Sequence, residues 1–130
     1  MAISDTLVNL LLVGAGSGIG GMTRYSVGKV INTSSTGGFP WSTLAVNLIG
    51  CLIIGVIYGL IDRGINIDTS LKLFLTVGFC GGFTTFSTFA HENYLLFSGG
   101  HFFSFIVYAA TTFIFGLVLV YLGYLFVRKF

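Results

Sequence analysis

The sequence is poor in charged residues and in proline. Asp, Glu, Lys and Arg make up only 8% of its 130 residues, and there is a single proline. The net charge is +2, and no run of basic residues is present that could bind a nucleic-acid backbone. A soluble domain of this length could not bury a composition in which 55% of the residues are hydrophobic. The composition therefore excludes an ordinary soluble domain and argues against nucleic acid as a partner.

Cysteine is scarce as well. Cys51 and Cys80 both fall inside long apolar stretches, where we expect small packing residues and no disulfide. The first apolar stretch, which starts near Leu7, follows no basic residue and continues to Met22. We therefore expect it to be a membrane crossing and not a cleaved signal peptide.

The few charges divide the chain into long uncharged stretches. Four of these cover residues 6–23, 30–61, 73–91 and 93–127. About 20 apolar residues are needed to cross a hydrocarbon core of about 30 Å, so each stretch can hold one crossing. We predict an all-α membrane protein, a single domain over residues 1–130, with a Ser/Thr/Gly loop at 32–39. Its four transmembrane helices are expected at about 6–31, 40–61, 69–97 and 101–126.

The segment 76–93 differs from the other apolar stretches. It contains three glycines that are followed by four hydroxyl residues, namely Gly78, Gly81, Gly82, Thr84, Thr85, Ser87 and Thr88. Each glycine weakens a helix by roughly 1 kcal/mol relative to alanine, and hydroxyl groups away from water need hydrogen-bond partners. We predict that the third helix is broken at Gly81–Gly82, in the middle of the membrane, and that it faces an ion. Phe83, Phe86 and Phe89 recur every three residues, which predicts one aromatic face.

Polar residues recur at helical spacing in the second and fourth helices. The second helix carries Thr43, Asn47, Gly50 or Cys51, Ile54 and Tyr58, and the fourth carries Ser104, Tyr108, Thr111 or Thr112, and Phe115. Asn47 is the only amide in its crossing, and it is either a hydrogen-bond partner between helices or a donor that faces an ion. The stripe of the fourth helix is open to two interpretations, helix packing and an ion pathway.

The first helix combines small residues with one charge. Gly14 and Gly18, and likewise Gly16 and Gly20, form small-xxx-small patterns that allow another helix to approach closely. Arg24 follows them, and it is either a snorkelling interfacial residue or a buried structural or vestibule charge.

The basic residues define the orientation only weakly. With four crossings, both termini and the middle loop share one side, and the basic residues there are Arg63, Lys72, Arg128 and Lys129. The other side has Arg24 and Lys29, so the difference is 4 − 2 = 2. A chain with so little preference can insert both ways. Because its polar faces must contact protein and not lipid, an antiparallel homodimer is expected.

Three motifs together resemble the Fluc (CrcB) fluoride channels. They are G-x-x-x-R-Y at 20–25, N-L-I-G at 47–50 and G-F-C-G-G-F-T-T-F-S-T-F at 78–89. The resemblance implies a dual-topology homodimer in the inner membrane of a prokaryote, with two narrow fluoride pores and a structural Na⁺ that is not transported. The implied function is passive exit of F⁻ from the cell, which lowers fluoride toxicity, and no enzymatic activity.

The resemblance also implies roles for individual residues. The backbone carbonyls of Gly81 and Thr84 would bind the sodium ion, and oxygen atoms freed by a helix break are suitable ligands for it. Asn47, Phe86 and Phe89 would line the pore, because an amide N–H and the positive edges of aromatic rings can replace the water around an anion. The remaining residues implied are Ser87, Thr88, Tyr108, Thr112 and Glu92 on the fluoride pathway and Arg24 at the vestibule.

The main alternative is a small multidrug-type exporter coupled to protons. Such an exporter needs a carboxylate inside the membrane, normally in the first helix, and that helix has only Asp5 at its start. Glu92 lies late in the third helix. An enzyme is disfavoured: Ser87 and His91 lie one turn apart, but no carboxylate or oxyanion-hole motif supports a catalytic site there.

Overall fold

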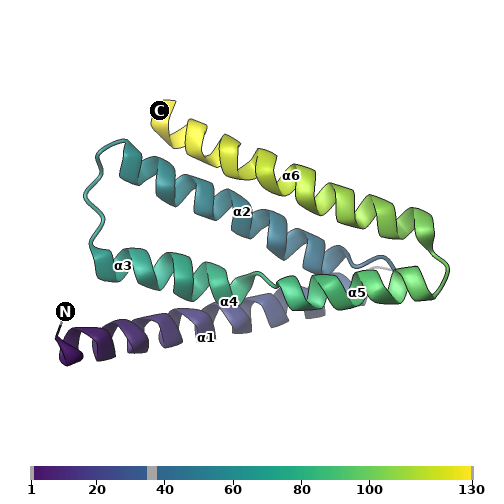
Figure 1. Cartoon of the computed structure of the whole chain (residues 1–130), viewed down its shortest axis with the longest axis horizontal. Helices are drawn as coiled ribbons and strands as arrows, with labels where there is room; N and C mark the ends of the chain where they lie inside the picture. The colour runs from purple at the N-terminus through teal and green to yellow at the C-terminus, as the bar shows by residue number, and fades with distance from the viewer. Residues whose placement is uncertain (1, 35–37, 130) are drawn as a thin grey trace.

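The computed structural model describes residues 2–34 and 38–129, and within them all regular structure is helical. Four long helical segments run back and forth along the molecule (Figure 1). The segments long and apolar enough to cross a membrane are Ile3–Ile31, Trp41–Asp62, Thr69–Ser98 and Phe102–Lys129. The all-α architecture with four long apolar helices is therefore confirmed.

The helices end one to three residues later than predicted, and their starts lie within three residues of the predicted ones. They are α1 Ile3–Ser34, α2 Trp41–Asp62, α3 Thr69–Leu73, the π-helical η1 Phe74–Cys80, α4 Gly81–Phe83, α5 Phe86–Ser98 and α6 Phe102–Lys129. Because α1 continues to Ser34, it takes up part of the predicted loop at 32–39, of which residues 35–37 lie outside the described residues. The third crossing is thus made of four consecutive helical pieces, α3 to α5.

The two ends of the molecule carry different connections. Both termini and the α2–α3 loop lie at one end, and the α5–α6 turn lies at the other (Figure 1). At the first end Tyr124 donates a hydrogen bond to Asp62, and the Arg63 guanidinium donates to the carbonyl of Val127 over 3.1 Å. These bonds join the last turns of α2 and α6.

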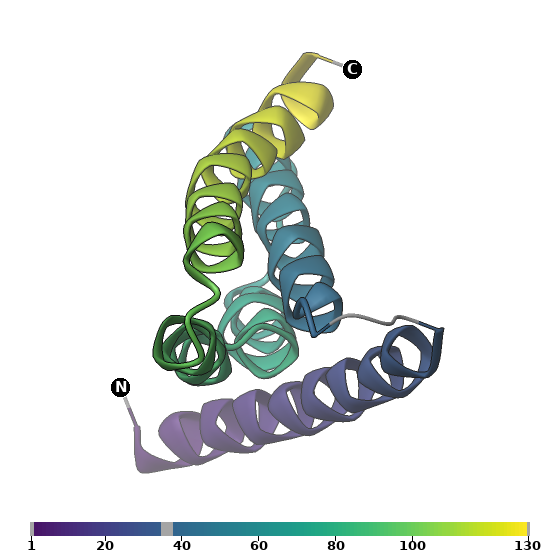
Figure 2. The same ribbon diagram turned by 90° about the vertical axis from the view of Figure 1, so that its right-hand side faces the viewer.

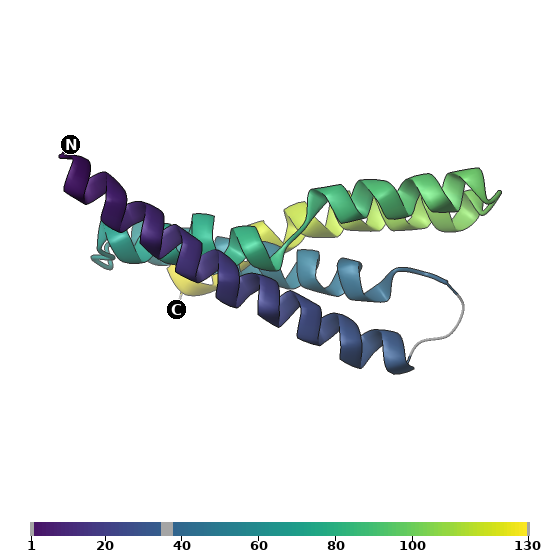
Figure 3. The same ribbon diagram turned by 90° about the horizontal axis from the view of Figure 1, so that it is seen from below.

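Glycines allow α1 to lie directly against the third crossing. A Cβ atom on Gly16 would lie 2.5 Å from the carbonyl oxygen of Phe74, and one on Gly20 would collide with the backbone of Phe79. On the other face of α1, a Cβ atom added to Gly14 or Gly18 would have no described atom of another element within 4 Å. One of the two predicted glycine pairs is therefore used in packing within the chain. Figure 3 shows α1 running along α3 and α4 and not along α5.

A second close pair is formed by α2 and α6. A Cβ atom on Gly59 would lie 2.7 Å from the Tyr124 carbonyl oxygen, and one on Gly123 would lie 2.6 Å from that of Leu52. Figure 2 shows this pair rising away from α1, with the third crossing between them. The break in the third crossing is therefore held between two closely packed layers.

The break lies three residues later than the sequence predicts. Gly81 and Gly82 are helical, and the chain is extended at Thr84 (φ −94°, ψ 164°) and Thr85 (φ −154°, ψ 121°). The predicted break at Gly81–Gly82 is therefore wrong. Gly82 has a different function, because a Cβ atom there would collide with the Ser17 backbone of α1. The glycines permit close helix contact, and the two threonines leave the helix.

The predicted shared face of Phe83, Phe86 and Phe89 is also wrong. Phe83 is buried and stacks on Phe79 with ring centroids 5.4 Å apart. Phe86 is 79% exposed and begins α5 on the far side of the break. Spacing of three residues places side chains on one face only while the helix continues.

Candidate functional site

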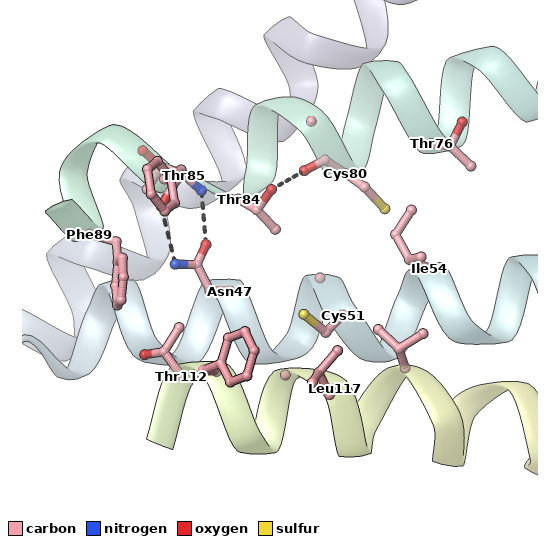
Figure 4. Close-up of a pocket in the computed structure, with 16 residues that line it drawn as sticks. Asn47, Cys51, Ile54, Thr76, Cys80, Thr84, Thr85, Phe89, Thr112 and Leu117 are labelled. Atoms are coloured by element: carbon pink, nitrogen blue, oxygen red, sulfur yellow. Dashed lines mark hydrogen bonds between the residues drawn. The ribbon is translucent and has the colours of Figure 1, made fainter. Parts of the chain in front are cut away.

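The break is held by a side chain of α2 (Figure 4). The Oδ1 atom of Asn47 accepts a hydrogen bond from the backbone N–H of Thr85 over 2.8 Å. Its Nδ2 atom donates to the carbonyl oxygen of the same residue over 3.2 Å. Both backbone polar groups of Thr85 are thereby satisfied by one amide. Asn47 is therefore a hydrogen-bond partner between helices, and its second N–H is not used in this pair.

Thr85 in turn begins α5 as its N-cap. Its Oγ1 atom accepts a hydrogen bond from the backbone N–H of Thr88 over 3.2 Å, as N-cap hydroxyls do. On the other side of the break, the Thr84 hydroxyl donates to the Cys80 carbonyl oxygen over 2.8 Å. The two adjacent threonines therefore close the two helix ends that meet at the break.

These bonds redirect the amides that a continuous helix would use. In an α-helix the N–H of Thr85 would bond to the carbonyl of Gly81, and that of Thr88 to the carbonyl of Thr84. Both N–H groups are used elsewhere, by Asn47 and by the Thr85 hydroxyl. The Thr84 carbonyl shares a planar peptide with the Thr85 N–H, so it points away from Asn47. The carbonyls of Gly81 and Thr84 thus lack their helical donors and suit a hard cation such as Na⁺.

A groove of about 540 Å³ opens beside the break, and we call it the break groove. It lies between α2, the third crossing and α6 (Figure 4). Its lining includes Asn47, Gly50, Cys51, Ile54, Cys80, Gly81, Thr84, Thr85, Phe86, Phe89, Thr112 and Gly116. The groove therefore contains both proposed sodium ligands and three of the predicted pore residues.

Aromatic rings lead from the break groove into the protein. The ring centroids of Phe86 and Phe89 lie 5.9 Å apart, and Phe89 meets the ring of Tyr108 edge-on at 5.1 Å. Tyr108 is completely buried, and its hydroxyl donates to Oε1 of Glu92 over 3.0 Å. The row of rings thus ends at a carboxylate.

That carboxylate lines a second cavity of about 660 Å³, the mouth cavity. Its lining includes Arg24, Lys29, Ser42, Thr43, Thr85, Thr88 and Glu92. The Nε atom of Arg24 donates to the carbonyl oxygen of Gly82 over 3.1 Å. Arg24 is therefore half-buried at the break and is not a snorkelling residue at the end of α1. Tyr108 lies between the two cavities, with its ring on Phe89 and its hydroxyl on Glu92.

A scan against family models matches the chain to one family. The model described as CrcB-like protein, Camphor Resistance (CrcB), matches residues 11–124, which include all residues that line the two cavities. The chain belongs to the CrcB family. The chain is a multi-pass membrane protein, with four helices long and apolar enough to cross a membrane among its described residues.

Curated relatives share most of the length of the chain. A Fluoride-specific ion channel FluC of Phocaeicola vulgatus is 44% identical over 115 residues, which cover 88% of this chain and 94% of the relative. The protein of that name from Azobacteroides pseudotrichonymphae is 40% identical over 92% of this chain and 95% of its own. The one from Leptospira interrogans is 37% identical over 94% and 96%. The chain is thus similar to these channels over nearly its whole length.

The remaining predicted residues occupy different positions in this CrcB chain. Thr112 lines the break groove, and its Oγ1 atom is buried without a hydrogen-bond partner among the described residues. Thr111 and Phe115 line neither cavity, so Thr112 is the better placed of the two threonines. Ser87 is exposed and lines neither cavity, with its hydroxyl 3.5 Å from that of Thr85.

Sequence reasoning did not assign several lining residues of the two cavities to a site, among them Thr85, Thr43, Gly116 and Lys29. Thr85 is the N-cap that follows the break, and a hydroxyl residue directly before a helical run is a recognisable N-cap pattern. Thr43 lies one turn before Asn47 on the predicted stripe of α2. Gly116 lies one turn after Thr112. Lys29 carries no signal beyond its position five residues after Arg24.

Proposed function

We propose that this chain is a channel that lets fluoride leave the cell passively and so lowers its toxicity. The similarity to fluoride-specific channels over nearly the whole chain carries this proposal. The two cavities, which share Thr85 and have Tyr108 between them, support it, since they align the amide, hydroxyl and aromatic groups that such a pathway needs. We further propose that residues 1–130 form a single transmembrane domain of the bacterial inner membrane.

The fluoride pathway runs through the two cavities. In the break groove, the free N–H of Asn47, the Thr112 hydroxyl and the edges of Phe86 and Phe89 can replace the hydration of a small anion. Beyond Tyr108, the mouth cavity offers Thr88 and the positive charge of Arg24, with Glu92 holding the tyrosine hydroxyl. Ser87 lies beside the start of α5, where a second copy of the chain can bring it to the pathway. Chloride is larger than fluoride, so a constriction built for fluoride excludes it.

The break groove needs a cover when the chain lies in a membrane. Phe86 is 79% exposed, and the polar groups of Asn47 and Thr84 line a groove that is open to the outside. Polar groups and irregular backbone at membrane depth are stable only against protein or water. A second, antiparallel copy provides this cover, and the weak bias of the basic residues permits both orientations.

The same dimer completes a sodium site. The carbonyls of Gly81 and Thr84 lack the amide donors of a continuous helix, and Gly81 is exposed. Two carbonyls from each of two copies would surround an ion on the two-fold axis. The sodium ion would hold the two copies together and would not be transported.

A proton-coupled exporter is not favoured by any observation. Asp5 is the only carboxylate of α1, and it is exposed at the start of that helix. Glu92 is bonded to Tyr108 and lines the mouth cavity, at a distance from the break groove. The chain therefore works as a passive channel and not as an exporter or an enzyme.

Substitution of Phe86 tests the pathway. Phe86→Ile removes the aromatic edge but keeps an apolar side chain, so the protein should fold and dimerise normally. Fluoride efflux from proteoliposomes, read with a fluoride electrode, should slow by roughly tenfold or more, as about 1.4 kcal/mol added to the barrier would cause.

Phe97→Ile is the matched control. Phe97 lies on the same helix, is 54% exposed and packs on Phe102 and Phe105 far from both cavities. It should conduct at the wild-type rate. Normal efflux through Phe86→Ile, or chloride efflux from wild type as fast as fluoride efflux, would show that the pathway is wrong.

Chemical labelling tests the dual topology. Cys51 and Cys80 are first replaced by serine, and single cysteines are then placed at Ala2 and at Ser98, which are exposed at opposite ends of the molecule. A membrane-impermeant thiol reagent on intact cells should label about half of the molecules of each variant, because the basic residues give little orientation preference. Complete labelling of one variant and none of the other would mean a single orientation.

Removal of sodium tests the cation site. Replacement of Na⁺ by a large organic cation during purification should weaken the dimer, measured by size-exclusion chromatography, because the interface loses the ion that its carbonyls bind. A Na⁺ gradient should drive no fluoride flux. Radioactive Na⁺ that crosses the membrane together with fluoride would contradict a structural role.

A further inference from the structure

Arg24 contacts the third crossing through a hydrogen bond from its Nε atom to the backbone. No described carboxylate forms an ion pair with it. The acceptor is the carbonyl of Gly82, the residue that follows Gly81 in the sequence. Gly82 itself lies against the backbone of Ser17 on α1, since no Cβ atom would fit there. The contact between the helices therefore brings Arg24 directly to this peptide group.

The peptide that Arg24 holds is next to a proposed sodium ligand. The Gly82 carbonyl belongs to the peptide that follows the Gly81–Gly82 peptide, and each peptide is planar. The two peptides share the Cα atom of Gly82, so fixing the Gly82 carbonyl anchors one end of the Gly81–Gly82 peptide. On the other side of the site, Asn47 fixes the peptide that contains the Thr84 carbonyl. One side chain from α1 and one from α2 thus hold the peptides on either side of the Phe83–Thr84 peptide.

Charge does not explain the position of this guanidinium. A positive group close to a sodium site opposes binding of the ion, whereas a hydrogen bond to a half-buried carbonyl removes an unsatisfied acceptor. A fluoride vestibule would need the charge but would not need Nε–H on Gly82. The hydrogen bond to Gly82 therefore points to a structural function of Arg24, which the sequence could not distinguish from that of a vestibule charge.

We propose that Arg24 is a positioning residue for the sodium carbonyls and that it acts through Nε–H on Gly82, independently of its charge. This inference rests on the proposed sodium site. It assigns α1 a specific function at the break, although no described side chain of α1 lines the break groove.

Two substitutions separate the hydrogen bond from the charge. In Arg24→Gln, the side-chain nitrogen follows the same number of bonds as Nε, so an N–H donor remains while the charge is lost. In Arg24→Lys, the charge remains, but a methylene group replaces Nε. The quantity measured is the Na⁺ concentration that gives half of the maximal thermal stabilisation in detergent, with Na⁺ exchanged against a large organic cation.

Arg24→Gln should need Na⁺ within about twofold of wild type, and Arg24→Lys about tenfold more, which corresponds to about 1.4 kcal/mol. Arg63→Gln is the control, because Arg63 also donates to a backbone carbonyl but lies at the end of α2. It should leave the Na⁺ requirement unchanged. The single tryptophan, Trp41, reports unfolding by its fluorescence.

If Arg24→Lys needs as much Na⁺ as wild type and Arg24→Gln needs more, then the charge of Arg24, and not its Nε–H group, supports the sodium site. Equal behaviour of the two variants, or an Arg24→Gln protein that does not fold, would also overturn the proposal. A wild type whose stability does not depend on Na⁺ would refute the sodium site instead. Arg24 would then be judged by thermal stability alone, where Arg24→Gln should match wild type and Arg24→Lys should fall below it.

Discussion

A membrane does not supply hydrogen bonds to an interrupted helix, and this constraint shapes the whole site. Where the third crossing leaves the helix at Thr84 and Thr85, each freed backbone group needs a partner from the protein. Asn47 supplies two hydrogen bonds to Thr85, and the Thr85 hydroxyl supplies one to Thr88. The carbonyls of Gly81 and Thr84 are among the groups that these bonds leave without a helical donor, and they are the ligands of the proposed sodium site.

Packing is what brings those side chains to the break. Gly20 and Gly82 let α1 and the third crossing touch through their backbones, which places Arg24 at the Gly82 carbonyl. Gly50 lies beside the Thr84 methyl group, in the turn of α2 that follows Asn47. The glycines thus affect the site indirectly. They set the distances between the helices, and these distances allow polar side chains to reach the interrupted backbone.

Composition and spacing predicted the four apolar helices and an interruption in the third one, and they singled out Asn47 and Arg24, whose side chains bond to the backbone at and just before that interruption. They could not locate the break, because a glycine pair is equally compatible with close helix packing and with a helix interruption. Only the contact of Gly82 with the Ser17 backbone shows that this glycine is used for packing. The common face expected for three phenylalanines failed for the same reason, since helical spacing has no meaning across an interruption. Thr85 was not singled out because its N-cap function depends on where the break falls.

Fluoride conduction should depend above all on the bond between Asn47 and the interrupted backbone. The most direct measurement compares initial fluoride efflux from proteoliposomes that contain Asn47→Leu with those that contain Asn93→Leu. Asn93 is also a buried amide, but its Nδ2 atom donates to the Phe89 carbonyl oxygen within its own helix. We expect a loss of efflux of roughly tenfold or more for Asn47→Leu, the effect of about 1.4 kcal/mol on the barrier, and near wild-type efflux for Asn93→Leu. Wild-type efflux through a folded Asn47→Leu protein would contradict this dependence.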